Sequence, residues 1–224
     1  MQSPLPGFRA VIFDMDGLVL DSEPTYAFAW MKAAEEFGTP LEEAFLRGLF
    51  GRHADDVEAA LAQRIGPEFD RERYLAAASR HWRTHVTVHG IATLPGVENL
   101  LALLERNGIP YALATNSDGP YATECLRHAK MDGRFAKTVT RDQVAQGKPE
   151  PDLFLEAARR LGVAIEQCLV LEDSATGLLA ARRAGATPVL VLDRPAPEDS
   201  AALASLSYRT LDEFAGHLSA KAWL

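Results

Sequence analysis

The interpretation of the chain starts from one stretch near its beginning, Val11-Ile12-Phe13-Asp14-Met15-Asp16-Gly17-Leu18-Val19-Leu20-Asp21-Ser22. An apolar run from Ala10 to Phe13 leads into two carboxylates spaced two residues apart, and a glycine follows. Such a run is typical of a buried strand in a parallel sheet, and ligands bind beyond the carboxyl ends of these strands. Side chains two residues apart share a side of an extended strand, so Asp14 and Asp16 are candidates for holding a cation. A simple Asp-Gly turn is the alternative.

Length and composition limit the class of protein. The chain has 224 residues, of which 47% are hydrophobic and 24% charged, an ordinary globular composition for one large domain or two smaller ones. The formal net charge of −8 argues against a nucleic-acid partner, because phosphate backbones bind basic faces. The longest apolar runs are only strand-sized, so we expect no membrane partner. With no secretory pattern at the start and only two cysteines, a cytoplasmic location is expected.

The segment from residue 22 to residue 89 has helical periodicity almost throughout. Ser22-Glu23-Pro24 predicts a helix start, with Ser22 as the capping residue. Further helices are predicted over 41–50, 54–65 and 71–86. We therefore expect residues 21–90 to form an inserted helical domain.

After this segment, apolar strands alternate with amphipathic helices. The alternation is typical of a parallel sheet with right-handed crossovers, and it ends in a Pro-rich loop over 193–200 and a terminal helix. We expect an α/β fold in which residues 1–20 and 91–224 form a discontinuous core around a doubly wound, Rossmann-like parallel sheet.

Polar residues follow several of the predicted strands directly. Asp14 and Asp16 follow the first, Thr115-Asn116 a later one and Glu172-Asp173 another, and Lys148 lies in a loop before a helix. Carboxyl ends of parallel strands share one edge of the sheet, so these groups can converge. Oxygen-only donors suit Mg²⁺, and a lysine with loop amides beside the cation suits a phosphate group. The alternatives are a solvated lysine and a helix cap formed by the acidic run.

Four motifs stand in order along the chain: Phe-Asp-Met-Asp-Gly at 13–17, Ala-Thr-Asn-Ser at 114–117, Gly-Lys-Pro at 147–149 and Leu-Glu-Asp-Ser at 171–174. In these motifs the chain resembles the haloacid dehalogenase (HAD) superfamily phosphatases with a helical cap (subclass I), and in particular their β-phosphoglucomutase-like branch. The resemblance covers nearly the whole chain. One motif alone is weak evidence, whereas four in order are a strong signal.

The resemblance implies roles for the motif residues. Asp14 is expected to be the nucleophile, which accepts the phosphoryl group as an aspartyl-phosphate, and Asp16 the general acid and then the general base. Thr115 and Lys148 are expected to bind the transferring phosphoryl oxygens. The implied Mg²⁺ ligands are Asp14, Asp16 (through its backbone carbonyl), Asp173 and, more weakly, Glu172. The implied phosphate-binding groups are Gly17, Asn116 and Ser117.

The helical insert corresponds to the cap that closes over the substrate in this superfamily. Phe50-Gly51-Arg52-His53 resembles its substrate-specificity loop, so Arg52 and His53 are candidate substrate contacts together with Glu23. An exposed loop arginine is the alternative for Arg52.

These features predict a Mg²⁺-dependent phosphomonoester hydrolase that acts on a small phosphorylated metabolite, such as a sugar phosphate, through an aspartyl-phosphate intermediate. The runner-up is a phosphosugar mutase. Mutases of this branch carry a histidine where this chain has Tyr26, and Ser-Lys-Asn where it has Ser117-Asp118-Gly119. A non-catalytic relative that binds phosphoryl ligands is the third hypothesis, although such proteins usually lose Asp14 or Asp16. We expect a monomer or a weak dimer.

Overall fold

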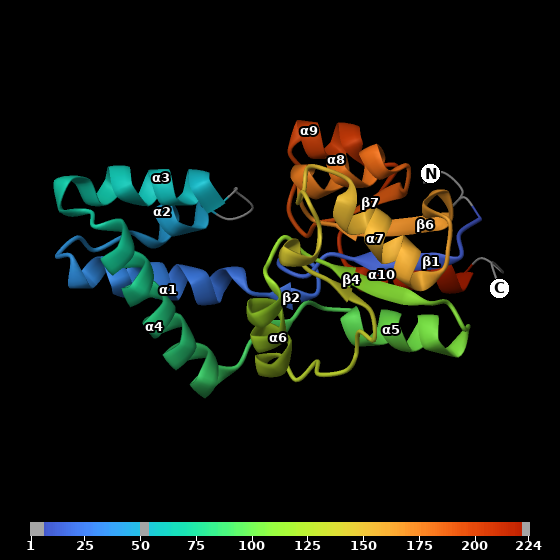
Figure 1. The fold of residues 1–224 in the computed structure, drawn as a ribbon, viewed down its shortest axis with the longest axis horizontal. Helices are drawn as coiled ribbons and strands as arrows, with labels where there is room; N and C mark the ends of the chain where they lie inside the picture. Colours follow the sequence, from blue (N-terminus) through green and yellow to red (C-terminus); the bar gives the residue numbers. More distant parts are fainter. Residues whose placement is uncertain (1–6, 50–53, 221–224) are drawn as a thin grey trace. The chain divides into compact units, whose positions relative to one another are not determined.

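A computed structural model describes residues 7–49 and 54–220 of the chain (Figure 1). The chain divides into two compact units, which we call the core unit (Met1–Leu20 and Thr93–Leu224) and the helical unit (Asp21–Ala92).

The core unit is built on a parallel sheet of six strands, in the order β5-β4-β1-β6-β7-β8. The strands are β1 (Ala10–Phe13), β4 (Tyr111–Ala114), β5 (Thr138–Val139), β6 (Cys168–Glu172), β7 (Thr187–Val191) and β8 (Leu206–Tyr208). Every residue of β1 is fully buried, because both faces of this central strand are covered. The predicted α/β fold with a parallel sheet is confirmed.

The register of the three central strands places their carboxyl ends side by side. Phe13 at the end of β1 pairs with Leu113 of β4 on one side and with Leu171 of β6 on the other. The backbone N–H of Asp14 continues the ladder by donating to the Leu171 carbonyl at 3.1 Å. As a result, the residues that follow these positions lie at one edge of the sheet.

Helices cover the sheet of the core unit. They are α5 (Val97–Arg106), α6 (Gly119–His128), α7 (Asp152–Leu161), α8 (Ala175–Ala184), α9 (Glu198–Leu203) and α10 (Leu211–Ala220), with short 3-10 turns at Arg141–Gln143 and Ile165–Gln167. The α7 and α8 helices pack on the face that carries Ile12 and Val170, in a cluster rich in alanine. Small side chains allow this close approach. Phe13 faces the other way, edge-on to Tyr111 and Phe135.

The helical unit consists of α1 (Glu23–Glu36), α2 (Glu43–Arg47), α3 (Ala54–Ile65), a 3-10 turn (Gly66–Glu68) and α4 (Arg71–His89). The α1 and α4 helices make most of its contacts, and the fully buried Tyr74 sits in its apolar core. The chain enters and leaves this unit through β2 (Leu20–Asp21) and β3 (Ala92–Thr93), which form a separate two-stranded sheet.

Several local expectations need correction. The helix predicted over 41–50 is shorter, because α2 covers only Glu43–Arg47. Ser22 does precede α1, but its side chain makes no cap hydrogen bond, since its backbone is already helical. The end of the predicted loop 193–200 is the start of α9. Among the helices of the described ranges, none combines the length and the apolar character that crossing a bilayer requires.

Candidate active site

The aligned strand ends of the core unit bring the sequence-predicted polar residues together. Asp14 follows β1, Thr115 follows β4 and Glu172 closes β6, while Lys148 reaches them from the loop before α7. Asp14, Thr115, Lys148 and Glu172 are all buried, although they are polar. Burying a charge is unfavourable unless it is paired, so the arrangement of partners explains how the cluster is tolerated.

Lys148 pairs with both buried carboxylates of this cluster. Its ammonium group donates to one carboxylate oxygen of Asp14, to Oε1 of Glu172 at 2.7 Å and to the carbonyl of Ala114 at 3.0 Å. The three donors of the ammonium therefore have three acceptors. The Nζ atom also lies 5.0 Å from the centre of the Phe154 ring on α7, a favourable cation–π position.

Burial and the ion pairs act in opposite directions on these groups. Burial raises the pKa of Asp14 above its usual range, and Lys148 opposes that shift. Burial alone would lower the pKa of Lys148, but the carboxylates of Asp14 and Glu172 outweigh it and raise that pKa. Lys148 therefore stays charged, whereas an additional positive charge beside Asp14 would favour its ionised form.

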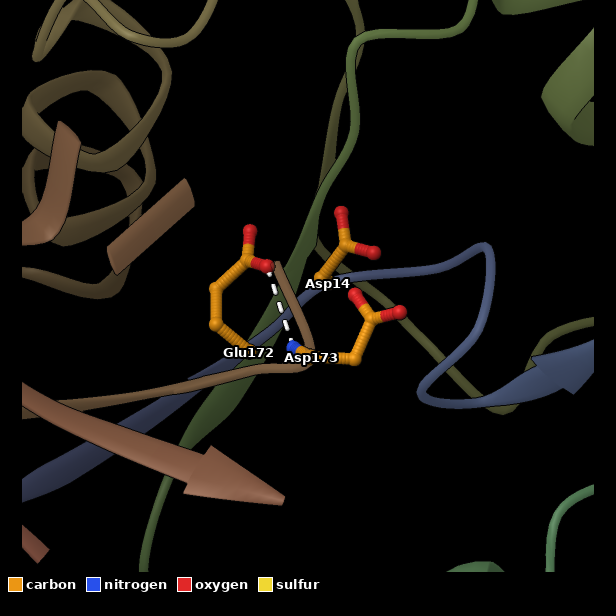
Figure 2. Close-up of side chains that lie close together, drawn as sticks. All are labelled: Asp14, Glu172 and Asp173. Atoms are coloured by element: carbon orange, nitrogen blue, oxygen red, sulfur yellow. Dashed lines mark hydrogen bonds between the residues drawn. The ribbon is translucent and has the colours of Figure 1, made fainter. Parts of the chain in front are cut away.

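Three carboxylates form a group with the spacing of a metal site. Each of Asp14, Glu172 and Asp173 offers one oxygen within 4.8 Å of the others, and Figure 2 shows the three side chains side by side. Within residues 7–49 and 54–220, it is the one such cluster of potential ligands. The donor atoms are all oxygens, and the single positive charge of Lys148 offsets only part of the negative charge of the three carboxylates. The set therefore fits a hard divalent cation such as Mg²⁺.

Gly17 leaves room for Asp173 beside this group. Its backbone has a φ of +81°, which favours glycine, and a Cβ there would overlap the Asp173 carboxylate. The motif at 13–17 predicts that Gly17 lines the phosphate site. The geometry gives it the additional task of admitting a metal-ligand candidate.

Glu172 joins the cluster to the start of α8. Its Oε2 accepts hydrogen bonds from the N–H of Asp173 at 3.2 Å and from the hydroxyl of Ser174 at 2.9 Å. The Ser174 hydroxyl accepts in turn from the N–H of Gly177, as an N-cap of α8. Ser174 therefore caps α8, as the alternative interpretation of this motif predicted. Glu172 and Asp173 belong at the same time to the three-carboxylate group.

Asp16 and Ser117 are joined to each other. The Ser117 hydroxyl donates to Oδ2 of Asp16 at 3.0 Å, and the Ser117 N–H donates to the hydroxyl oxygen of Thr115 at 3.0 Å. The Asp16 carboxylate is not part of the three-carboxylate group. Its expected metal contact through the backbone carbonyl stays a prediction.

The Asn116 side chain contacts the backbone of Lys148. Its Oδ1 accepts from the Lys148 N–H at 2.8 Å, and its Nδ2 donates to the Lys148 carbonyl at 3.2 Å. The motif predicts that Asn116 binds phosphate. The link to Lys148 was not predictable, because it joins two loops that are far apart in the sequence.

Of the candidate substrate contacts of the insert, only Glu23 lies among the described residues. Glu23 is the first residue of α1 in the helical unit, where it is half-buried. Arg52 and His53 lie outside the described residues.

The roles of two further residues in the site were not predicted from the sequence. Gly177 is buried inside α8, and a Cβ on it would overlap the Glu172 carboxylate. Its signal was present in the sequence, since a glycine in the first turn of a helix is less favourable than alanine and calls for a packing reason. Ala114 contributes only its carbonyl to Lys148, so its side-chain type carries no such signal.

Comparison with known proteins adds independent information. A family model described as haloacid dehalogenase-like hydrolase matches residues 8–185. A phosphorylated carbohydrates phosphatase of Thermotoga maritima is 34% identical over 177 residues, which cover 79% of this chain and 82% of that protein. A β-phosphoglucomutase of Bacillus subtilis is 29% identical over 183 residues, or 79% and 80% of the two chains. The crystal structure of a HAD family hydrolase from Deinococcus radiodurans, with bound phosphate and sodium, superimposes with a TM-score of 0.77 at 31% identity, covering 97% of this chain and 98% of that one.

Proposed function

Because the chain belongs to the haloacid dehalogenase-like hydrolase family, we propose that this enzyme is a Mg²⁺-dependent phosphatase that hydrolyses the phosphate monoester of a small metabolite. The observation that carries the proposal is the placement of Lys148 between Asp14 and Glu172 at the aligned ends of β1, β4 and β6. The arrangement combines a carboxylate nucleophile with a fixed positive charge that can face phosphoryl oxygens.

The first chemical step uses Asp14 and Asp16. A carboxylate oxygen of Asp14 attacks the phosphorus atom and forms an aspartyl-phosphate, while the bond between phosphorus and the ester oxygen breaks. Protonated Asp16 gives its proton to that oxygen, so the product leaves as an alcohol. The hydrogen bond from Ser117 supports this role, because it fixes the direction of the Asp16 carboxylate.

The second step restores the enzyme. The Asp16 carboxylate takes a proton from water, and the water oxygen attacks phosphorus. The bond between phosphorus and Asp14 breaks, and inorganic phosphate leaves. Lys148 and the hydroxyl of Thr115 stabilise the negative charge on the phosphoryl oxygens during both steps, since a fixed donor in a buried site acts more strongly than one in water.

The candidate metal ligands are the carboxylates of Asp14, Glu172 and Asp173, and we propose the backbone carbonyl of Asp16 as a further ligand. Mg²⁺ held by this set would neutralise the carboxylates and orient the phosphoryl group. The direction of the Asp14 pKa shift supports the need for added positive charge, because a nucleophilic carboxylate must be ionised.

A phosphorylated sugar or a close relative is the substrate class that we propose. The support comes from the Thermotoga maritima relative, which is named for phosphorylated carbohydrates. The helical unit would act as the lid that excludes water from the phosphoryl group and selects the substrate. We further propose a reducing, cytoplasmic location, since Cys125 and Cys168 are both buried free thiols.

A phosphosugar mutase is the second candidate, supported by the similarity to the Bacillus subtilis mutase. Asp118 weakens it. This side chain accepts a hydrogen bond from the Tyr121 N–H at 2.9 Å and caps α6, which fixes a carboxylate where mutases of this branch carry a lysine. A carboxylate there would repel a second phosphate group.

The test is a phosphate-release screen over small phosphate monoesters, with Mg²⁺ and after its removal by a chelator. We expect the native enzyme to release phosphate from a subset of sugar phosphates, and Asp14→Asn to lose at least three powers of ten in kcat while it stays folded. Asp132→Asn, at an exposed position, is the matched control and should behave as the native enzyme does.

Other outcomes would change the assignment. Equal release by Asp14→Asn and the native enzyme would exclude Asp14 as the nucleophile. Formation of an isomeric phosphate ester and a bisphosphate, followed by phosphorus NMR, would favour the mutase. Full activity in the presence of the chelator would contradict the metal requirement.

A further inference from the structure

We propose that Asn116 is a positioning residue, which holds the backbone of Lys148 so that the lysine side chain reaches the reacting phosphoryl group. The inference rests on the proposed function, in which Lys148 stabilises that group. It differs from the expectation that the Asn116 side chain itself binds phosphate.

The evidence begins with the two hydrogen bonds between these residues. One amide side chain satisfies both main-chain groups of Lys148, accepting from its N–H at 2.8 Å and donating to its carbonyl at 3.2 Å. The pair of bonds imitates one rung of a β-ladder. Asn116 is itself exposed, so its contribution to the structure comes through these bonds and not through burial in the core.

The loop that carries Lys148 needs such a support. Lys148 lies between the 3-10 turn at Arg141–Gln143 and helix α7, in a segment without strand or helix. Its ammonium nevertheless has to meet Asp14, Glu172 and the Ala114 carbonyl at once. A lysine side chain has many rotamers, so its tip is placed accurately only if its backbone is fixed.

Gly147 provides a second, independent observation. A Cβ on this residue would lie 2.5 Å from Oδ1 of Asn116, closer than real Cβ atoms come to other atoms. A glycine immediately before the lysine is therefore what lets the Asn116 side chain lie against the Lys148 backbone. The Gly147-Lys148 pair of one loop and the Thr115-Asn116 pair of the other loop therefore fit against each other.

Direct phosphate binding by the Asn116 side chain is the competing explanation, and it makes a different kinetic prediction. Loss of a direct contact that exists already in the bound substrate would raise KM. Loss of Lys148 placement would lower kcat, because the charge on the transferring group interacts with Lys148 most strongly in the transition state.

The experiment compares Asn116→Ala with Asn99→Ala in the full chain, using a sugar phosphate or p-nitrophenyl phosphate with Mg²⁺. Asn99 is the matched control, because its Nδ2 also makes a side-chain hydrogen bond, to Asp212, but on α5 and away from the cluster. We expect Asn116→Ala to lower kcat at least tenfold and to change KM less than threefold. Asn99→Ala should change neither by more than twofold.

A second readout needs no turnover. The exchange rate of the Lys148 amide hydrogen, measured by NMR on labelled protein, should rise at least tenfold in Asn116→Ala and remain unchanged in Asn99→Ala. Asn116→Asp keeps an oxygen that accepts from the Lys148 N–H, so it should restore much of the protection.

The inference would be overturned by an unchanged Lys148 exchange rate in Asn116→Ala, or by faster exchange with normal kcat. A rise in KM with normal kcat would favour direct phosphate binding instead. If the native enzyme releases phosphate from no ester, the proposed function fails, while the exchange measurement still decides whether Asn116 holds the Lys148 backbone.

Discussion

The core unit and the helical unit use polar groups in their interiors in opposite ways. In the core unit, the buried ammonium group of Lys148 pairs with the buried carboxylates of Asp14 and Glu172 at the strand ends. Among the described residues of the helical unit, the buried polar groups belong to uncharged side chains: the hydroxyl groups of Ser22, Thr25 and Tyr74 and the indole N–H of Trp82. Charge in a protein interior needs several fixed partners, and aligned strand ends provide them.

The interior of the helical unit depends on aromatic and aliphatic packing. Tyr74 packs against Phe37 and Phe69, and its hydroxyl donates to the Trp30 carbonyl at 2.9 Å. Such an interior stabilises the unit without offering an ion for chemistry. Substitutions in the two units should therefore differ in kind: those at the strand ends should change turnover, and those in the helical core should change stability.

Next to the loss expected for Asp14→Asn, the largest effect should come from Asp16→Asn. We expect kcat/KM to fall by about two to three powers of ten for alkyl phosphate esters, because a poor leaving group needs a proton. The loss should be much smaller for p-nitrophenyl phosphate, which releases a stable anion. Steady-state kinetics over esters of graded leaving-group acidity measures this difference, and kcat/KM isolates the step in which the leaving group departs.

Ser117→Ala is the companion variant, since it leaves Asp16 in place and removes the hydrogen bond that directs it. It should show the same dependence on the leaving group with a loss of about tenfold. Equal losses on both classes of ester in Asp16→Asn would contradict the general-acid role.

An intermediate effect is expected for Gly177→Ala. The added methyl group would overlap the Glu172 carboxylate, which is one of the partners of Lys148. We expect kcat to fall about tenfold or more, together with a loss of about 1–3 kcal/mol in the free energy of unfolding. Enzyme assays and denaturant unfolding together test both parts.

Gly216→Ala is the matched control, because Gly216 also lies in a helix of the core unit but has open space around it. It should leave kcat unchanged and stabilise the fold by up to about 1 kcal/mol. Identical behaviour of the two variants would show that the space beside Glu172 is not critical.

The smallest effect on turnover should be that of Tyr74→Phe in the helical unit. Removing the hydroxyl leaves the Trp30 carbonyl without this donor and should lower the free energy of unfolding by about 1 kcal/mol. Turnover of p-nitrophenyl phosphate should remain within twofold. A large loss of turnover at unchanged stability would contradict the expectation that substitutions in the helical core change stability and not turnover.

The fold was largely predictable because its strands are apolar runs bounded by turn residues. The buried strand β1 coincides with the apolar run from Ala10 to Phe13, and α3 has the limits that were predicted for the helix over 54–65. The strands β2 and β3 have two residues each, which is too short for periodicity to reveal. Helix α9 begins directly after Pro197 in a segment whose prolines suggest a loop.

The candidate site, like the fold, was predictable from the sequence only in part. The convergence of Asp14 and Glu172 was predictable because both directly follow apolar strands of a parallel sheet, and Lys148 could join them from the loop before a helix. The links from Asn116 to Lys148 and from Ser117 to Asp16 depend on side-chain directions between separate loops. Sequence spacing carries no information on those directions, so these links required the structure.

The pairing of β2 with β3 has a consequence for how this enzyme can evolve. The helical unit is an insertion, and the strands at its start and end pair with each other. The entropy of closing an inserted segment grows only with the logarithm of its length, and insertions with adjacent ends are well tolerated. Descendants can therefore lengthen, shorten or exchange the insertion while the parallel sheet, and the chemistry at its edge, are inherited intact.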